Sequence, residues 1–290
     1  KKVQSIGVEE WLLSFPMMSQ VHEVCSYADV SLNSEMATIE ALNQSAQNKN
    51  KKHKIILMVD LGDLREGVLP ENVPAMTQEI LKFSHIELMG VGVNLTCYGG
   101  VIPTPVNLGQ LEDIAKEMEG IIGKPLQIVS GGNSSSLYLL EKGTMPSKIN
   151  QLRVGEAIVL GRETAFGDPI EGTHDDVFLL EAEVIENKKK GSMPIGEIGM
   201  DAFGNTPSFE DKGMIQRVIV AIGQQDVNAS GVNPLDSGVE VLGASSDHML
   251  LDVTKSESSY PLGSSLKFKM DYGAMLKLFT SPYVDVTFED

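Results

Sequence analysis

Residues 54–67 read KIILMVDLGDLREG, a short apolar run that passes directly into a polar loop with two glycines. From residue 11 to about 160, similar apolar runs alternate with longer segments that have helical spacing. This alternation is typical of βα units around a parallel sheet. Six runs are predicted to be strands: 11–15, 29–33, 54–60, 87–95, 126–131 and 149–155.

Two of the intervening segments have clear helical features. SEMATIEALNQSAQ (34–47) begins with Ser34, which could cap a helix. GQLEDIAKEMEGIIG (109–123) places Ile114, Met118 and Ile121 on one apolar face, and Gly123 is expected to end the helix.

Polar or glycine-rich loops follow several predicted strands, namely DLGDLREG, NLTCYGG, SGGNSSS and GEAIVLGRE. In a β/α barrel, the loops after the strands form the active-site face. A doubly wound open sheet also places loops at strand ends, and six strands suffice for it. The strand count alone does not choose between these two folds.

The sequence pattern changes after about residue 170, where short apolar runs are separated by Gly, Pro, Asn, Asp and Ser. This predicts a mostly antiparallel β domain, with NKKKGSMP (187–194) as a solvated turn. The predicted division is an α/β barrel domain over residues 1–168 and a mainly β domain over residues 169–290.

Composition limits the classes of function. Forty acidic and 23 basic residues give a formal charge of −17, which disfavours binding to nucleic acids and to anionic membranes. No apolar run approaches the roughly 20 residues of a membrane span, and no secretory signal is visible. Two cysteines cannot form a disulfide framework, so a reducing, cytoplasmic compartment is expected.

The segment Ser130–Ser136, SGGNSSS, lies between a predicted strand and a helix that begins near Leu137. Glycines let a ligand approach the backbone, and free amides and hydroxyls attract an anion, so this segment is a candidate phosphate cradle. A glycine–serine turn with a serine N-cap would have the same sequence.

Arginine is rare, with four in the chain, and Arg65 and Arg153 stand at predicted strand ends. A guanidinium there suits a carboxylate or a phenolate, although Arg65 could instead pair with Asp63 or Glu66.

The five histidines are scattered, so no metal site is predicted. Cys97 is interpreted as a small buried thiol rather than a reactive one.

The ordered segments VDLGDLREG, GVGVNLTCYG, VSGGNSSS and LRVGEAIVLGRE, followed by GASSDHMLLDV, resemble the alanine-racemase-like family of pyridoxal-phosphate enzymes. The ornithine racemase branch is the most similar. The resemblance implies a (β/α)8 TIM barrel with an appended β domain, and a homodimer with shared active sites. It also implies racemisation of a small amino acid by two-base α-proton transfer. Ornithine is the expected substrate, with alanine, lysine or serine as alternatives.

The resemblance also implies roles for individual residues. Asn133 and Ser134 would contact the cofactor phosphate, and Arg153 would face its pyridine nitrogen. An always-charged guanidinium would keep the ring neutral and so limit transamination. The implied cofactor-binding residues are Asn94, Ser130, Gly132, Asn133, Ser134, Arg153, Gly155 and Glu156, and the implied catalytic residues are Arg65, Asp247 and His248.

Two departures from the family pattern bear on mechanism. Gln224 stands where the family has a tyrosine that acts as one of the two bases, and glutamine cannot titrate. His248, beside Asp247, could titrate instead, or could simply belong to a turn. A carboxylate partner is expected for the substrate's distal ammonium, and the candidates are Glu156, Glu163, Asp226 and Asp247.

No early apolar strand ends in the lysine that holds the cofactor in this family. Six predicted strands against eight, at about 30 residues per βα unit, imply that roughly 60 residues precede Lys1. The expectation is therefore a truncated or processed chain without the Schiff-base lysine. On that expectation, the alternative to a racemase is a non-catalytic module that holds pyridoxal phosphate or another phosphate ester.

Overall fold

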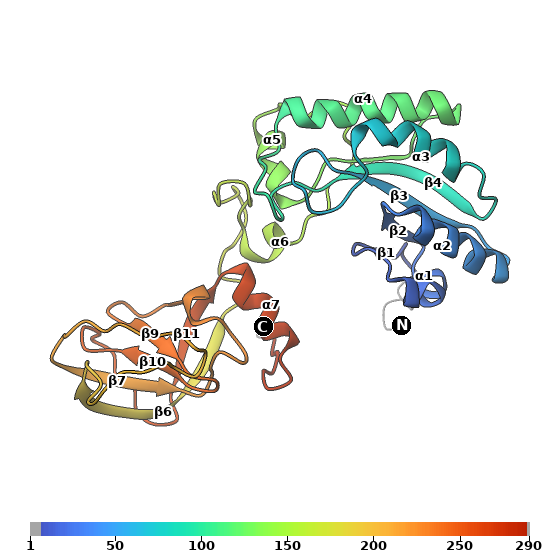
Figure 1. Cartoon of the computed structure of the whole chain (residues 1–290). Coiled ribbons are helices and arrows are strands. Elements are labelled where there is room, and N and C mark those ends of the chain that lie inside the picture. The colour runs from blue at the N-terminus through green and yellow to red at the C-terminus, as the bar shows by residue number, and fades with distance from the viewer. Residues whose placement is uncertain (1–6, 289–290) are drawn as a thin grey trace. The chain divides into compact units, whose positions relative to one another are not determined.

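The computed structural model describes residues 7–288 (Figure 1). The chain divides into two compact units, one ending at Thr173 and the other beginning at His174. Within the described residues, no helix is long and apolar enough to cross a membrane.

The first unit contains a five-stranded parallel sheet in the order β1-β2-β3-β4-β5. This order follows the chain without reversal, as in a β/α barrel, whereas a doubly wound sheet reverses at a switch point. The strands are β1 (Trp11–Leu12), β2 (Val30–Asn33), β3 (His53–Val59), β4 (Ile86–Val93) and β5 (Ile128–Ser130).

The helices of this unit pack on one face of the sheet. A large core joins buried residues of the strands with Ile39, Ile80 and Leu111 of three helices. A second core, around Leu32 and Ile56, contains no residue of a described helix. Helices on a single face indicate a barrel wall, so the doubly wound alternative is wrong. The helices are α1 (Val21–Tyr27), α2 (Met36–Asn48), α3 (Val73–Ile80) and α4 (Pro105–Ile122), with α5 (Leu137–Glu141) and α6 (Glu156–Leu160) further along the chain.

Three predicted strands are much shorter than expected, and one of them, the fifth, covers only Ile128–Ser130 of the predicted 126–131. The first stops at Leu12, four residues before Pro16, which has no backbone N–H to donate. The sixth, 149–155, is not a continuous strand: it makes one bridge, between Ser130 and Gln151. Here the Asn150 side chain accepts the hydrogen bond of the Val129 N–H at 2.8 Å, so part of the ladder is replaced by a side chain. The segment nevertheless runs beside β5, because Gly131 N–H donates to the Gln151 carbonyl.

Helix ends depend on local capping. Ser34 does not cap α2, which begins after Glu35 without a side-chain cap. Helix α4 begins four residues earlier than predicted, because Thr104 and Asn107 form a reciprocal capping box ahead of Gly109. Gly123 ends α4 with a left-handed φ of 78°, as predicted.

The second unit is a six-stranded antiparallel sheet in the order β8-β11-β6-β7-β10-β9. Helix α7 (Tyr272–Thr280) closes its core through Ala274 and Leu278, which meet Val218 and Phe268. This confirms the predicted mainly β domain. The strands are β6 (Leu180–Gly191), β7 (Met214–Val220), β8 (Val232–Pro234), β9 (Glu240–Ala244), β10 (Met249–Asp252) and β11 (Ser265–Met270).

The lysine run is not a turn. Strand β6 continues through it to Gly191, and Lys188 and Lys190 pair in register with Arg217 and Ile215 of β7. Both lysines form ion pairs with Glu186. A run of polar side chains is compatible with a solvent-facing strand as well as with a loop, because pairing in a sheet requires only backbone hydrogen bonds.

Candidate active site

Polar groups converge where β3, β4 and β5 end, at one edge of the parallel sheet. Arg65 follows β3, Asn94 follows β4, and Ser130 is the last residue of β5. Neighbouring parallel strands bring their carboxyl ends together, so loops that are far apart in sequence meet here. The structure therefore joins the predicted residues of the first unit into one site.

Arg153 lies at the centre of this site. Its guanidinium donates hydrogen bonds to Ser130 Oγ, to Asn94 Oδ1 and to the carbonyl of Val93, the last at 2.8 Å. Burial lowers the pKa of Arg153 to about 10, so the guanidinium remains charged at neutral pH. The acceptors around it are all uncharged, so none of its hydrogen-bond partners neutralises its positive charge; the Glu66 carboxylate acts on it only through space.

Asn94 connects the two arginines through Glu66. Its Nδ2 donates to Glu66 Oε1, and the same carboxylate pairs with the Arg65 guanidinium. That hydrogen bond raises the pKa of Arg65 above its ordinary value. Sequence reasoning considered Glu66 only as a partner of Arg65; its contact with Asn94 joins residues 28 positions apart and has no local sequence signal.

The Ser130–Ser136 loop is tightly built. A Cβ on Gly131 would lie 2.5 Å from Ile149 Cγ2, and Gly132 has a φ of +103°, which L side chains rarely adopt. The Ser136 hydroxyl donates to the Gly131 carbonyl at 2.6 Å. The cap that starts the following helical turn is Asn133, whose Oδ1 accepts from Ser135 N–H, so the serine cap of the alternative interpretation does not form.

Donors gather around the Ser134 hydroxyl. The backbone N–H groups of Gly155 and Ala157 point at Ser134 Oγ, at 3.4 and 3.2 Å. The neighbouring Ser135 hydroxyl is fully buried and has no hydrogen-bond partner in the described part of the chain. Hydroxyl and backbone donors in this arrangement fit a phosphate group. Glu156, at the start of α6, pairs with Arg162 at 3.4 Å.

Cys97 lies in the same site and is exposed, which contradicts its interpretation as a buried thiol. Asn133 Nδ2 donates to its sulfur at 3.2 Å. Partial desolvation raises the pKa of the Cys97 thiol, while the Arg65 guanidinium opposes that rise. The loop after β4 is fixed by buried Asp63, whose carboxylate accepts from the backbone N–H groups of Tyr98 and Gly99. Sequence reasoning missed this role of Asp63.

In the second unit, Asp247 and His248 occupy the turn between β9 and β10. Asp247 Oδ1 and His248 Nδ1 lie 2.8 Å apart, and this contact lowers the pKa of Asp247. Gln224 N–H donates to the Ser245 carbonyl at 2.8 Å, so the Gln224 segment lies against this turn. A Cβ on Gly223 would lie 2.4 Å from Asp247 N, which explains why a glycine precedes Gln224.

Two of the four candidate partners for a distal ammonium have structural roles. Buried Glu163 accepts from the backbone N–H groups of Ala165, Phe166 and Asp168, so its carboxylate holds a loop. Buried Asp226 accepts from the Ser281 hydroxyl at 2.6 Å. Among residues 7–288, no group of three His, Cys, Asp or Glu side chains could hold a metal ion.

The sequence of the chain is similar to those of known proteins. Residues 3–163 match the family model "Alanine racemase, N-terminal domain". Ornithine racemase of Acetoanaerobium sticklandii is 52% identical over 98% of this chain and 81% of its own length. Lysine racemase of Thermotoga maritima is 42% identical over 99% of this chain and 81% of its own length.

Solved structures have the same fold. Alanine racemase of Clostridium difficile 630 aligns with a TM-score of 0.64 and 16% identity, over 96% of this chain and 74% of that one. Alanine racemase from Bartonella henselae, with covalently bound pyridoxal phosphate, aligns with a TM-score of 0.61 and 20% identity, over 94% of this chain and 73% of that one. At this identity, the likeness concerns the fold alone.

Proposed function

The chain belongs to the alanine racemase family, and from that premise we propose that it is a pyridoxal-phosphate-dependent racemase of ornithine. The single observation that carries the proposal is the position of Arg153. An arginine with only uncharged acceptors, beside a serine- and glycine-rich loop at the strand ends, suits a phosphorylated ring better than a purely structural role.

The residues of the first unit fit the cofactor. Ser134 Oγ and the N–H groups of Gly155 and Ala157 would hold the phosphate, with Asn133 shaping the loop. Arg153 would face the ring nitrogen, Asn94 would lie beneath the ring, and Arg65 would lie near the phenolic oxygen. When bound, pyridoxal phosphate supplies an electron sink that acidifies the α-proton of the amino acid.

Arg153 and Arg65 have different tasks in this proposal. Arg153 offers donors and no acceptor, so it does not support a protonated ring nitrogen. Arg65 is an exposed cation whose charge Glu66 offsets, and it would orient the substrate carboxylate. Hydrogen bonds through Glu66 and Asn94 link the two guanidiniums, so a change in the position of one would change the position of the other.

Proton transfer on one face would fall to His248, with Asp247 as its partner. When Nδ1 carries a proton, Asp247 accepts its hydrogen bond and leaves Nε2 free to take or return the α-proton. Gln224 lies against the same turn and can bind but cannot exchange a proton. We propose that the unit ending at Thr173 holds the cofactor, and that the unit beginning at His174 supplies this base.

The assembly and compartment are part of the same proposal. The family resemblance supports a homodimer, in which each β domain would complete the partner's site. The two cysteines are free thiols, Cys25 buried and Cys97 exposed, and this supports a reducing, cytoplasmic environment.

The test is a panel assay of the full-length protein with pyridoxal phosphate and single enantiomers of ornithine, lysine, alanine and serine. Loss of optical rotation is expected to be fastest with ornithine. Faster racemisation of lysine, the substrate named for the relative at 42% identity, would overturn the choice of ornithine. Cofactor binding without racemisation of any of the four would favour a non-catalytic module.

A further inference from the structure

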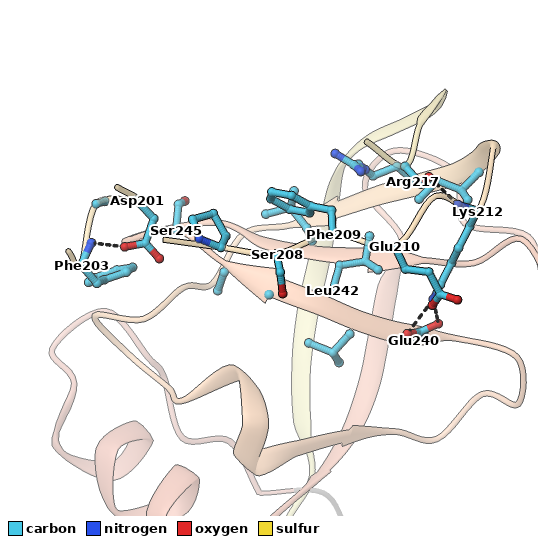
Figure 2. Close-up of a pocket in the computed structure, with 18 residues that line it drawn as sticks. Asp201, Phe203, Ser208, Phe209, Glu210, Lys212, Arg217, Glu240, Leu242 and Ser245 are labelled. Atoms are coloured by element: carbon cyan, nitrogen blue, oxygen red, sulfur yellow. Dashed lines mark hydrogen bonds and ion pairs between the residues drawn. The ribbon is translucent and has the colours of Figure 1, made fainter. Parts of the chain in front are cut away.

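The sheet of the second unit has a cavity on the face opposite its core. Strand residues alternate between the two faces, so Val218 and Val220 of β7 enter the core while Ile215 and Arg217 point the other way. Over this outer face, the segment 192–212 passes without strand or helix. The space between them measures about 550 Å³, within the usual size of a small-molecule site (Figure 2).

Most of the cavity wall is apolar. Ile215, Leu242 and Leu250 come from the strands. Phe203 and Phe209 come from the covering segment (Figure 2). Phe203 is 50% exposed and Phe209 44% exposed, so the two aromatic rings leave much of their surface uncovered.

Arg217 is a charged residue in this mostly apolar wall. Its Nε atom is sealed from solvent and has no hydrogen-bond partner among residues 7–288. Its guanidinium makes one long hydrogen bond, from Nη2 to the Gly191 carbonyl at 3.3 Å, and no ion pair within the described chain. A sealed donor without an acceptor is energetically unfavourable.

The other three arginines show that this is unusual for the chain. Arg65 and Arg162 pair with glutamates, and Arg153 has three acceptors. The remaining cation of the cavity wall, Lys212, is already held by both carboxylate oxygens of Glu240, at 2.8 and 2.9 Å. Arg217 is therefore the positive charge in this wall that a ligand can use.

We propose that this cavity binds a small organic monocarboxylate. Because Nε is sealed, the ligand would meet the outer end of the planar guanidinium, whose two Nη groups lie side by side and match the two oxygens of a carboxylate. The apolar body of the ligand would lie against Phe209, Leu242 and Ile215. A polyanion would fit less well, because the wall also carries the carboxylates of Asp201 and Glu210.

The test measures binding to the full-length protein by isothermal titration calorimetry. The probes are 3-phenylpropanoate and its neutral amide, 3-phenylpropanamide. The acid is expected to bind at least about tenfold more tightly than the amide, and Arg217→Gln is expected to remove that preference. Lys189→Gln is the matched control: it deletes a cation from the neighbouring strand on the opposite face of the sheet, outside the cavity wall, and should leave both affinities unchanged.

Three outcomes would overturn the proposal. In the first, the parent binds the acid and the amide equally. In the second, the acid binds Arg217→Gln as tightly as the parent, which would place it at another cationic site. In the third, neither probe binds the parent; a changed oligomeric state of Arg217→Gln would then mean that another copy of the chain fills the cavity. If circular dichroism shows that Arg217→Gln is unfolded, Arg217→Lys replaces it. That variant keeps the charge but loses the planar fork, and should weaken binding of the acid several-fold.

Discussion

Glu66 serves two groups with different requirements, since its carboxylate neutralises the Arg65 guanidinium and accepts from the Asn94 amide. Without it, the Asn94 amide could rotate, and the hydrogen bond from Arg153 to Asn94 Oδ1 would no longer be held. At the scale of single residues, the site therefore depends on a side chain that need not touch the substrate.

Glu66→Gln tests the electrostatics of this arrangement through the reactivity of the nearby Cys97 thiol. The Glu66 charge is one cause of the raised pKa of the Cys97 thiol. Removing it is expected to lower that pKa, so iodoacetamide should alkylate Cys97 faster at neutral pH. Rates are measured across pH by mass spectrometry. Cys97→Ser gives the background, since Cys25 is buried; an unchanged pH profile would contradict the prediction.

Arg153→Glu tests the role assigned to the central arginine. A carboxylate beside the ring nitrogen offers an acceptor, which favours the protonated ring and a stronger electron sink. Racemisation is expected to fall by at least about 100-fold, and keto acid from transamination is expected to appear.

Bound pyridoxal phosphate and thermal stability are measured alongside these rates. A variant that keeps the cofactor and racemises at the parent rate would remove Arg153 from the site. Lower stability with unchanged activity per folded molecule would assign Arg153 a structural role instead.

At the scale of elements, His53 joins the first residue of β3 to β2 through a 2.8 Å contact between its Nε2 and Ser31 Oγ. Burial lowers the pKa of His53 from 6.5 to about 4. The unfolded chain therefore binds more protons between these values, so stability is complete above pH 6.5 and declines as the pH falls toward 4.

Acidification from pH 7 to pH 5 is expected to reduce the free energy of unfolding by about 2 kcal/mol through His53 alone. His53→Gln should lose this contribution and respond less to pH. Urea unfolding is followed by the fluorescence of Trp11, the single tryptophan, which lies in β1 next to β2. An equal pH response in the variant and the parent would refute the assignment.

At the same scale, Gly109 inside α4 and Gly123 at its C-cap form a matched pair of substitution sites. Gly109 lies inside the helix with open space around it, so Gly109→Ala should stabilise the unit by about 0.5–1 kcal/mol. Gly123 has a φ of +78°, so Gly123→Ala should destabilise it by about 1 kcal/mol. Both are measured by urea unfolding, and changes of the same sign would contradict the explanation.

At the scale of the whole molecule, a dimer is the prediction that matters most. Size-exclusion chromatography with light scattering of the full-length protein should give twice the mass of one chain. Titration with salt serves as the control, because a chain with a charge of −17 repels its copies more strongly at low ionic strength. A monomer at all salt concentrations would contradict a shared active site.

The sequence predicts the two-part architecture well because hydrophobic periodicity is local. The apolar run 54–60 corresponds to β3, and Gly123 ends α4 as its conformational freedom suggests. Capping by Thr104 and the substitution of an Asn150 side chain for ladder hydrogen bonds depend on particular contacts, so helix starts and the sixth strand are predicted wrongly.

Much of the candidate site also follows from family motifs, but its connections do not. Asn94 and Arg153 are 59 positions apart, and nothing in either segment reveals that their side chains meet. The same holds for Asp63, whose carboxylate fixes the backbone of Tyr98 across 35 positions. Such contacts arise because neighbouring strands end together, which is a property of the folded sheet.

The strand order of the two sheets also sets the order in which each can form during synthesis. In the first unit, each strand pairs with the one translated just before it, as Lys54 of β3 does with Val30 of β2. In the second, Leu180 of β6 pairs with Phe268 of β11, near the far end of the chain. Long-range pairing is slow because a large loop must close first. The first unit can therefore grow strand by strand behind the ribosome, whereas the second cannot complete its sheet until β11, its last strand, has emerged to join β6 and β8.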